Sequence, residues 1–289
     1  MCRLFGLSAA PCRVKATFWL LDSPDSLAQQ SRQEPDGTGL GTFAADGSAR
    51  VEKQPIAAYH DAEFGREARE RESQTFVAHI RYASTGGLNL RNTHPFTQRG
   101  RLFAHNGVLQ GLAELDAELG DYLELVAGET DSERFFALIT QRTDRNDGDV
   151  TAGITDAVRW VANRLPVYAL NLVLTTATEL WALRYPDTHE LFVLERAAGG
   201  AHGGRHLDHV GRAGTVRAHC RQLAEHPAVV VASERMDAEP GWRALAPGEL
   251  LHVDSQLHIR SRTVIDSAPR HMLSLAQLSP GAAASQSAR

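Results

Sequence analysis

Apolar residues in this chain gather in short runs separated by turn residues, a pattern typical of single β-strands. Several runs lack a regular alternation of apolar and polar positions, which indicates strands buried on both faces. The segment 38–53 predicts a hairpin, because Asp46-Gly47 separates two strand-like runs. The other predicted strands lie at 2–9, 75–83, 101–109, 167–177, 179–185, 190–196, 228–234, 249–255 and 257–263.

Five segments are expected to be helical instead. Ile154, Val158, Val161 and Leu165 recur at intervals of four, three and four residues, which places them on one face of a helix. The predicted helices lie within 16–32, where a turn is also expected, and at 61–73, 131–142, 151–165 and 214–225. Strand clusters separated by helical blocks predict one α+β domain whose sheets are covered by helices.

Composition narrows the class of protein. With 43% hydrophobic and 22% charged residues, the 289-residue chain can bury a core without disulfides or a structural metal. The net charge of −5 gives no basic field for nucleic acid or an anionic membrane, and no apolar stretch approaches the roughly 20 residues of a membrane helix. Cys2, Cys12 and Cys220 are odd in number and lack CxxC spacing, so a reduced, cytoplasmic setting is expected.

Cys2 stands directly behind the initiator methionine, and its small side chain permits removal of Met1. The α-amino group would then belong to the same residue as the thiol. An α-amine has an ordinary pKa of about 7.7–8.0 and a thiol one of about 8.5, so the amine can accept the thiol proton. From position alone, the alternative is a small buried residue at the start of a strand.

Two polar features lie toward the ends of apolar strands. Asn106 and Gly107 either form a turn or direct a side-chain amide and a backbone N–H into one pocket. Two such donors form an oxyanion hole, which stabilises a tetrahedral acyl-transfer intermediate. Arg81 either forms a structural ion pair or holds a substrate carboxylate with its planar guanidinium.

The stretch Glu-Thr-Asp-Ser-Glu at 129–133 opens a predicted helix. Thr130 and Glu133 have the spacing of a capping box, and Asp131 is well placed to stabilise a helix N-terminus. This structural role does not exclude a contact between Asp131 and a substrate ammonium group.

Two other clusters are weaker candidates. The glycines of 36–41 suggest a nucleotide loop, but a GxGxxG motif would require glycine where the chain has Thr42, and no helix pattern follows. A second cluster of imidazoles and a carboxylate has the chemistry of a transition-metal site, although its glycines favour a flexible loop and no metal is expected. Its members are His202, His206, Asp208 and His209.

The order of the motifs resembles that of class II glutamine amidotransferase domains, which are N-terminal-nucleophile hydrolases. The motifs are Met-Cys-Arg at the start, PDGTGLG at 35–41, HIRYAS at 79–84, THPF at 93–96, AHNG at 104–107, ETDSE at 129–133 and the later stretch 229–250. The resemblance implies a four-layer αββα sandwich of two antiparallel sheets between helical layers. It implies one domain over 1–271 with a mature start at Cys2, and the Ala/Ser-rich segment 272–289 is expected to be a disordered tail.

The resemblance also implies roles for the motif residues. Cys2 would attack the side-chain amide of glutamine and form a thioester, with its own α-amine as the base. Asn106 and Gly107 would hold the oxyanion. Arg81 would bind the substrate α-carboxylate, and Asp131 would bind the α-ammonium group.

Further residues would support this site. Ser84 would add a hydrogen bond to the substrate, and His79, His94 and Thr130 would support the surrounding loops. The resemblance implies no metal and no organic cofactor. The expected substrate is glutamine or another γ-glutamyl amide.

Departures from the family pattern bear on the substrate and the partner. Sugar-phosphate amidotransferases typically read Arg-Trp-Ala-Thr where this chain reads Arg-Tyr-Ala-Ser at 81–84, and no synthase domain is expected after 228–234. The chain is thus similar to the stand-alone, YafJ-like members. It would be either a glutaminase that supplies a separate ammonia-accepting synthase or a hydrolase of a larger γ-glutamyl conjugate, as in the ergothioneine pathway. A catalytically idle partner-binding module is the alternative from another class, and the sequence predicts no oligomeric state.

Overall fold

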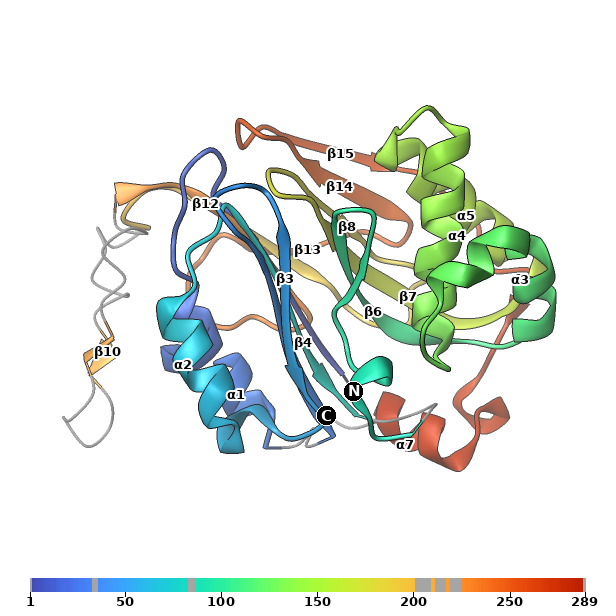
Figure 1. The fold of residues 1–289 in the computed structure, drawn as a ribbon, viewed down its shortest axis with the longest axis horizontal. Helices are drawn as coiled ribbons and strands as arrows, with labels where there is room; N and C mark the ends of the chain where they lie inside the picture. The colour runs from blue at the N-terminus through green and yellow to red at the C-terminus, as the bar shows by residue number, and fades with distance from the viewer. Residues whose placement is uncertain are drawn as a thin grey trace.

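A computed structural model of the chain describes residues 2–32, 36–82, 87–200, 209–210, 217–218 and 225–287. Two seven-stranded sheets form the centre of the molecule (Figure 1). Each carries helices on its outer face, so the predicted α+β sandwich with four layers is confirmed. Among the described residues, no helix has both the length and the apolar composition needed to cross a membrane.

The first sheet is antiparallel throughout and has the strand order β13-β9-β12-β1-β4-β2-β3. Its outer face packs against a π-helical turn and two short helices. Its strands are β1 (Arg3–Ser8), β2 (Gly37–Phe43), β3 (Ala49–Gln54), β4 (Thr75–Arg81), β9 (Phe192–Arg196), β12 (Ala228–Ala232) and β13 (Trp242–Ala244). The turn and helices are η1 (Phe18–Asp22), α1 (Leu27–Gln30) and α2 (Ala62–Glu70).

The second sheet has the order β15-β14-β8-β7-β6-β5, and β16 pairs with β7 in parallel at its margin. Three helices cover its outer face. Its strands are β5 (Phe96–Gln98), β6 (Arg101–Leu109), β7 (Pro166–Thr175), β8 (Leu180–Leu183), β14 (Glu249–Val253), β15 (Ile259–Thr263) and β16 (His271–Met272). The helices are α3 (Leu112–Leu119), α4 (Asp131–Arg145) and α5 (Val150–Arg164).

Alternate residues of the strands fill different layers of the core. In β1, Phe5 and Leu7 face the helices of the first sheet, whereas Leu4 belongs to an apolar cluster that includes Val173 and Leu102 of the second sheet. The apolar layer between the sheets therefore needs strands with two apolar faces, which explains why the sequence lacks a regular alternation.

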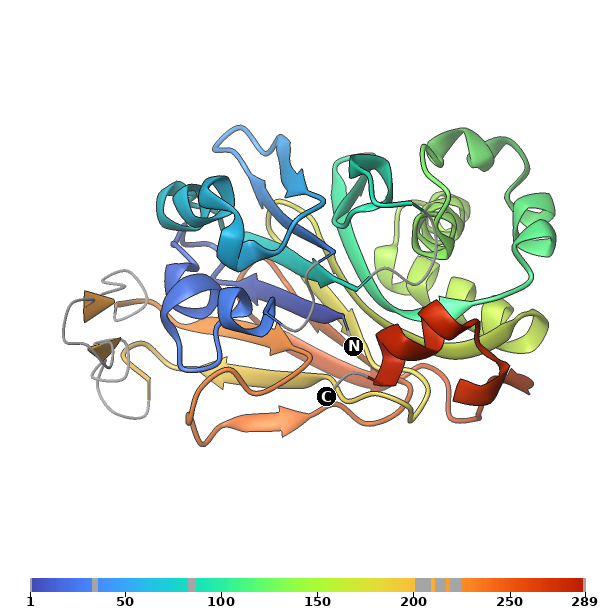
Figure 2. The same cartoon turned by 90° about the horizontal axis from the view of Figure 1, so that it is seen from below.

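The segment after residue 271 differs from the expected disordered tail. It contains β16, a short helical turn and α7 (Pro280–Ser287), which lies beside the start of β1 (Figures 1 and 2). Leu278 and Ala282 pack into a small apolar cluster with Tyr168, and His189 Nε2 lies 2.7 Å from Gln286 Oε1. Small residues in α7 allow this close packing on the second sheet.

The pairing of β1 with β4 places the start of β1 beside the end of β4, and these two strand ends carry residues of the candidate site. Arg3 pairs with Ile80 in this antiparallel register, so Cys2 lies opposite the end of β4, where Arg81 is found. Gly37 of β2 pairs with Arg81 on the other side. The site is thus built at the edge where these strands end.

Candidate active site

The Cys2 side chain is buried against the peptide of Tyr82. The backbone N–H of Tyr82 donates to Cys2 Sγ at 3.2 Å, and the thiol lies 3.4 Å from Tyr82 O. Only 8% of Cys2 is exposed to solvent. A thiol in this position is held by main-chain atoms, so its location depends on the β1–β4 register.

Asn106 lies in β6 and reaches across to the main chain of Cys2. Its Nδ2 donates to Cys2 O at 2.9 Å, and the side chain is 1% exposed. An amide nitrogen carries two hydrogens, so one donor is still available for a ligand. Asn106 Oδ1 is buried without a hydrogen-bond partner among the described residues. A buried acceptor of this kind costs about 1–3 kcal/mol when unsatisfied, which indicates that a donor belongs beside it.

Gly107 follows inside the same strand, and therefore the alternative of a turn at Asn106-Gly107 is wrong. A Cβ atom at position 107 would lie 1.8 Å from Ala169 O in the neighbouring strand and 2.6 Å from His105 Nε2. No side chain fits this space. The strands approach each other closely at this point because residue 107 is glycine.

Arg81 is buried at the end of β4, with 4% of its surface exposed. Its Nη1 donates to Gly87 O at 3.2 Å. Burial lowers the pKa of the guanidinium below its ordinary value, and the electrostatic interactions of Arg81 with Cys2, Asp36 and Asp131 act in the opposite direction. A buried cation with carboxylates in its surroundings can bind an anionic ligand without carrying a large unbalanced charge.

Asp131 is the first residue of α4 and is also buried. Its Oδ2 accepts from the backbone N–H of Leu109 at 2.8 Å, and its Oδ1 accepts from the N–H of Ser132 at 2.9 Å. These bonds fix the carboxylate between the end of β6 and the helix N-terminus. A carboxylate has about four acceptor positions, so it can still accept from an ammonium group.

The predicted capping box at the start of α4 is half formed. Thr130 Oγ1 accepts from the N–H of Glu133 at 3.2 Å, as expected for an N-cap. The Glu133 carboxylate instead accepts from the N–H of Gly128 at 2.6 Å. Glu133 therefore holds the preceding loop in place.

One pocket joins most of the predicted site residues. Cys2, Arg81, Gly107 and Asp131 line it together, and Asn106 adjoins it through the Cys2 carbonyl. Ser84 lies outside the described residues. The complete lining is Cys2, His79, Arg81, Tyr82, Asn92, His94, His105, Gly107, Thr130, Asp131 and Ser132.

Tyr82, Asn92, His105 and Ser132 in this lining were not predicted from the sequence. His105 Nδ1 lies 3.0 Å from Ser132 Oγ, which connects β6 to α4. Asn92 Nδ2 donates to the Glu129 carboxylate at 3.2 Å, and the N–H of Glu129 donates to Asn92 Oδ1 at 2.9 Å. Tyr82, His105 and Ser132 stand within the quoted motifs and Asn92 directly precedes one, and this position was their signal in the sequence.

His79 and His94 form a buried pair under the pocket. Their ring centroids are 4.1 Å apart, and none of their four ring nitrogens has a hydrogen-bond partner among the described residues. Burial lowers the pKa of His79 to about 3 and that of His94 well below its ordinary value, and neighbouring basic groups act in the same direction. Both rings are therefore neutral at neutral pH.

This burial predicts that acid weakens the fold through His79. Its folded-state pKa of about 3 lies below the ordinary value of 6.5. The unfolded chain therefore binds the extra proton as the pH falls below that ordinary value, and stability is lost on the acid side. Between pH 7 and 5, one such histidine lowers the free energy of unfolding by about 2 kcal/mol. Urea unfolding of His79→Gln should show a pH dependence weaker by this amount.

His271→Gln is the matched control, because His271 is exposed. It should keep the pH dependence of the unmodified protein. An unchanged dependence in His79→Gln would show that the ring is not kept neutral by burial.

The other candidate for a metal site is outside the described structure. His202, His206 and Asp208 are not described, and only the backbone of His209 is. Within the ranges that the structure covers, no group of three or more His, Cys, Asp or Glu side chains is arranged to hold a metal ion.

The fold matches that of a solved amidotransferase. Glutamine phosphoribosylpyrophosphate amidotransferase from B. subtilis superposes with a TM-score of 0.63 at 18% identity, over 94% of this chain and 51% of that one. The two sheets and their helical layers are therefore of the type found in that amidotransferase.

The chain belongs to the class-II glutamine amidotransferases, whose family model matches residues 1–273. It is 34% identical over 166 residues to YafJ of Escherichia coli, which covers 53% of this chain and 60% of that protein. It is 32% identical over 182 residues to the uncharacterized protein MJ1515 of Methanocaldococcus jannaschii, which covers 60% of this chain and 50% of that protein. The chain thus spans little more than half the length of these relatives.

Proposed function

We propose that this chain hydrolyses the γ-amide bond of glutamine, with Cys2 as the N-terminal nucleophile after removal of Met1. The observation that carries the proposal is the single pocket lined by the Cys2 thiol, a buried guanidinium at Arg81 and a buried carboxylate at Asp131. A nucleophile beside one cation and one anion suits an amino acid that carries its reactive amide at the other end.

The proposed reaction has two steps. The free α-amine of Cys2 takes the thiol proton while Sγ attacks the amide carbon, and the proton then passes to the leaving nitrogen, so ammonia departs and a thioester forms. Water next attacks the thioester carbon and gives its proton to the amine. The C–S bond breaks, and glutamate and the free thiol are released.

The oxyanion formed in each step needs hydrogen-bond donors that are already in place. The second hydrogen of Asn106 Nδ2 and the backbone N–H of Gly107 are the proposed donors. The buried Asn106 Oδ1, which has no hydrogen-bond partner in the part of the chain that the structure describes, supports the proposal, since it lies beside the Cys2 main chain and could accept from the free α-amine.

Recognition of the glutamyl end is assigned to Arg81 and Asp131. The Arg81 guanidinium would bind the α-carboxylate through paired hydrogen bonds, and Asp131 would bind the α-ammonium group. The half-exposed Tyr82 provides its backbone contact to Cys2 at the same strand end. Ser84 is proposed to add a contact to the substrate, and His79, His94 and Thr130 to support the loops.

The ammonia produced in this reaction would either be released into the solvent or be delivered to a synthase partner. The family supports the second use because related domains transfer glutamine nitrogen, as the name of the B. subtilis amidotransferase indicates. A larger γ-glutamyl conjugate would use the same recognition of the glutamyl end.

A glutamate-release assay tests this proposal. Purified protein is incubated with glutamine and with γ-glutamyl amine and thiol conjugates at equal concentrations. We expect glutamate from glutamine with the highest kcat/KM. A higher kcat/KM for a conjugate than for glutamine would identify conjugate hydrolysis as the activity. Absence of glutamate release from every compound would favour a catalytically idle binding module.

Arg81→Lys is the control for substrate recognition. Lysine keeps the charge but loses the planar pair of donors, so KM should rise by about tenfold for every substrate that has the free glutamyl end. An effect on glutamine alone would show that Arg81 does not bind the shared α-carboxylate.

A further inference from the structure

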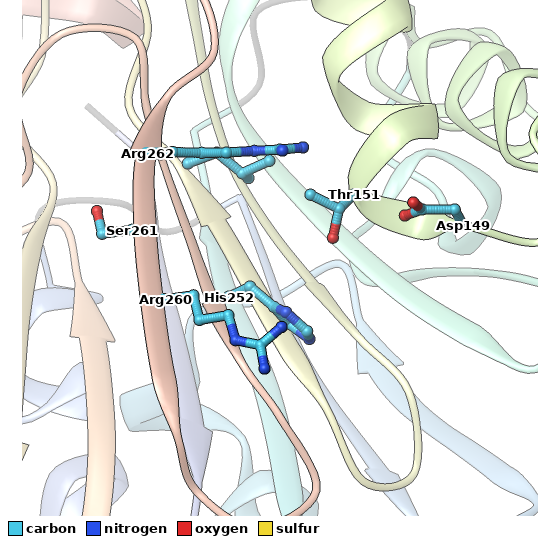
Figure 3. Close-up of a pocket in the computed structure, with 7 residues that line it drawn as sticks. Asp149, Thr151, His252, Arg260, Ser261 and Arg262 are labelled. Atoms are coloured by element: carbon cyan, nitrogen blue, oxygen red, sulfur yellow. The ribbon is translucent and has the colours of Figure 1, made fainter.

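A second pocket lies on the outer face of the second sheet, and none of its residues lines the Cys2 pocket. It holds about 250 Å³ between the edge strand β15, strand β14 and the start of α5. Figure 3 shows its polar side chains, which come from all three elements. They are Asp149, Thr151, His252, Arg260, Ser261 and Arg262.

Arg260 and Arg262 provide the positive charge of this pocket. They are separated by one residue in β15, so both side chains lie on the same face of the strand, roughly 7 Å apart along it. Arg260 pairs with His252 in the register of β14 and β15. Arg262 points from β15 toward the side of Thr151 (Figure 3).

Among the described residues, neither guanidinium is matched by a protein anion. Within the described ranges, no carboxylate lies at ion-pair distance from Arg260 or Arg262, and both side chains are exposed. His252 differs, because its Nε2 lies 3.0 Å from the Glu179 carboxylate and its ring stacks on Trp181 at 4.6 Å. The His252 imidazole is therefore held in place and forms one wall of the pocket, whereas the two arginine side chains can extend to contact a ligand.

The start of α5 provides neutral donors on the opposite side. Thr151 Oγ1 accepts from Trp181 Nε1 at 2.9 Å, and because an indole can only donate, the hydroxyl hydrogen of Thr151 can point into the pocket. The first turn of this 15-residue helix also presents its positive dipole end.

We propose that this pocket binds the phosphate group of a small phosphorylated molecule. Two guanidiniums match the charge of a dianion and its arrangement of oxygens, and the Thr151 hydroxyl adds a further donor. The volume admits a small molecule, and the net charge of −5 for the whole chain does not favour a polyanionic nucleic acid.

Asp149 sets the orientation of such a ligand. Its carboxylate caps α5 by accepting from the N–H of Ala152 at 3.0 Å, and it would repel a phosphate placed next to it. The phosphate therefore lies toward Arg260 and Arg262, and the organic part, with hydroxyl donors, lies toward Asp149. A phosphate monoester with a hydroxyl group should bind more tightly than inorganic phosphate.

Isothermal titration calorimetry tests this site with inorganic phosphate, glycerol 3-phosphate and succinate. We expect saturable binding of glycerol 3-phosphate, weaker binding of phosphate and no measurable binding of succinate. In the double variant Arg260→Ala/Arg262→Ala, the affinity for glycerol 3-phosphate should fall at least tenfold. Glutamate release from glutamine should be unchanged, which shows that the variant is folded and separates this proposal from the function of Cys2.

Arg50→Ala/Arg270→Ala is the matched control, since it removes the same charge from exposed arginines outside this pocket. It should keep the affinity of the unmodified protein. If both double variants lost affinity for glycerol 3-phosphate equally, the binding would result from general charge attraction, and the proposal would be overturned. Absence of saturable binding to the unmodified protein, or equal affinity for succinate, would overturn it too.

Discussion

Replacing Cys2 with alanine is expected to abolish glutamate release from glutamine. The substitution removes the only atom in the proposed mechanism that forms a covalent bond to the substrate. We expect kcat to fall by more than about 10³-fold, which corresponds to a loss of about 4 kcal/mol of transition-state stabilisation. Because the thiol is small and its hydrogen bonds to the peptide of Tyr82 are weak ones of sulfur, the fold should tolerate alanine. Steady-state glutamate release and circular dichroism measure the two properties separately.

Cys12→Ala is the matched control, because Cys12 is a free, half-buried cysteine that does not line the pocket. It should retain the full rate. Mass spectrometry of the active protein should show a chain that begins at Cys2. An active protein with Met1 retained would contradict the use of the α-amine as base, and an active Cys2→Ala would contradict the nucleophile itself.

The strands around this site were predictable because each has enough residues to show its pattern. The run 101–109 coincides with β6, and the run 75–83 contains β4. The three-residue strand β5 was missed. It joins β6 through a turn at Arg99 and Gly100, both with positive φ, and Arg-Gly lacks the Asn or Asp that usually marks such a hairpin.

The sequence shows that Cys2 follows Met1, but it does not show which distant residues lie beside Cys2 in the folded chain. Its proximity to Arg81 follows from the register of β1 on β4, which sequence periodicity does not define between distant strands. The contact of Asn106 with Cys2 O likewise spans 104 residues. Only the order of the family motifs made these residues one candidate site before the structure.

Pocket residues without a distinctive motif role could not be predicted. His105 alternates with Asn106 along β6, and so it faces α4 and contacts Ser132 instead of Cys2. His105 lines the pocket because α4 begins next to the end of β6, where the backbone N–H of Leu109 donates to the Asp131 carboxylate. Such contacts arise from packing between elements, and a single sequence carries no direct signal for them.

Replacing Gly107 with alanine is expected to damage both the fold and the site. The new Cβ would lie 1.8 Å from Ala169 O and 2.4 Å from Ala169 C, which are backbone atoms of β7 and cannot rotate away. The two strands must therefore separate, at a cost of about 2–4 kcal/mol, and the thermal midpoint should fall by roughly 5–15 °C. Differential scanning calorimetry measures this change.

The same displacement moves the proposed oxyanion donors. Asn106 precedes Gly107 and holds Cys2 O at 2.9 Å, so a strand shift of even about 1 Å should lower kcat by about 10²-fold below the unfolding temperature. Gly281→Ala in α7 is the matched control, because no described atom outside its own helical turn lies within 4 Å of its added Cβ. It should keep both the midpoint and kcat. A stable Gly107→Ala with full kcat would show that close contact of β6 and β7 is not needed to place Asn106 against Cys2.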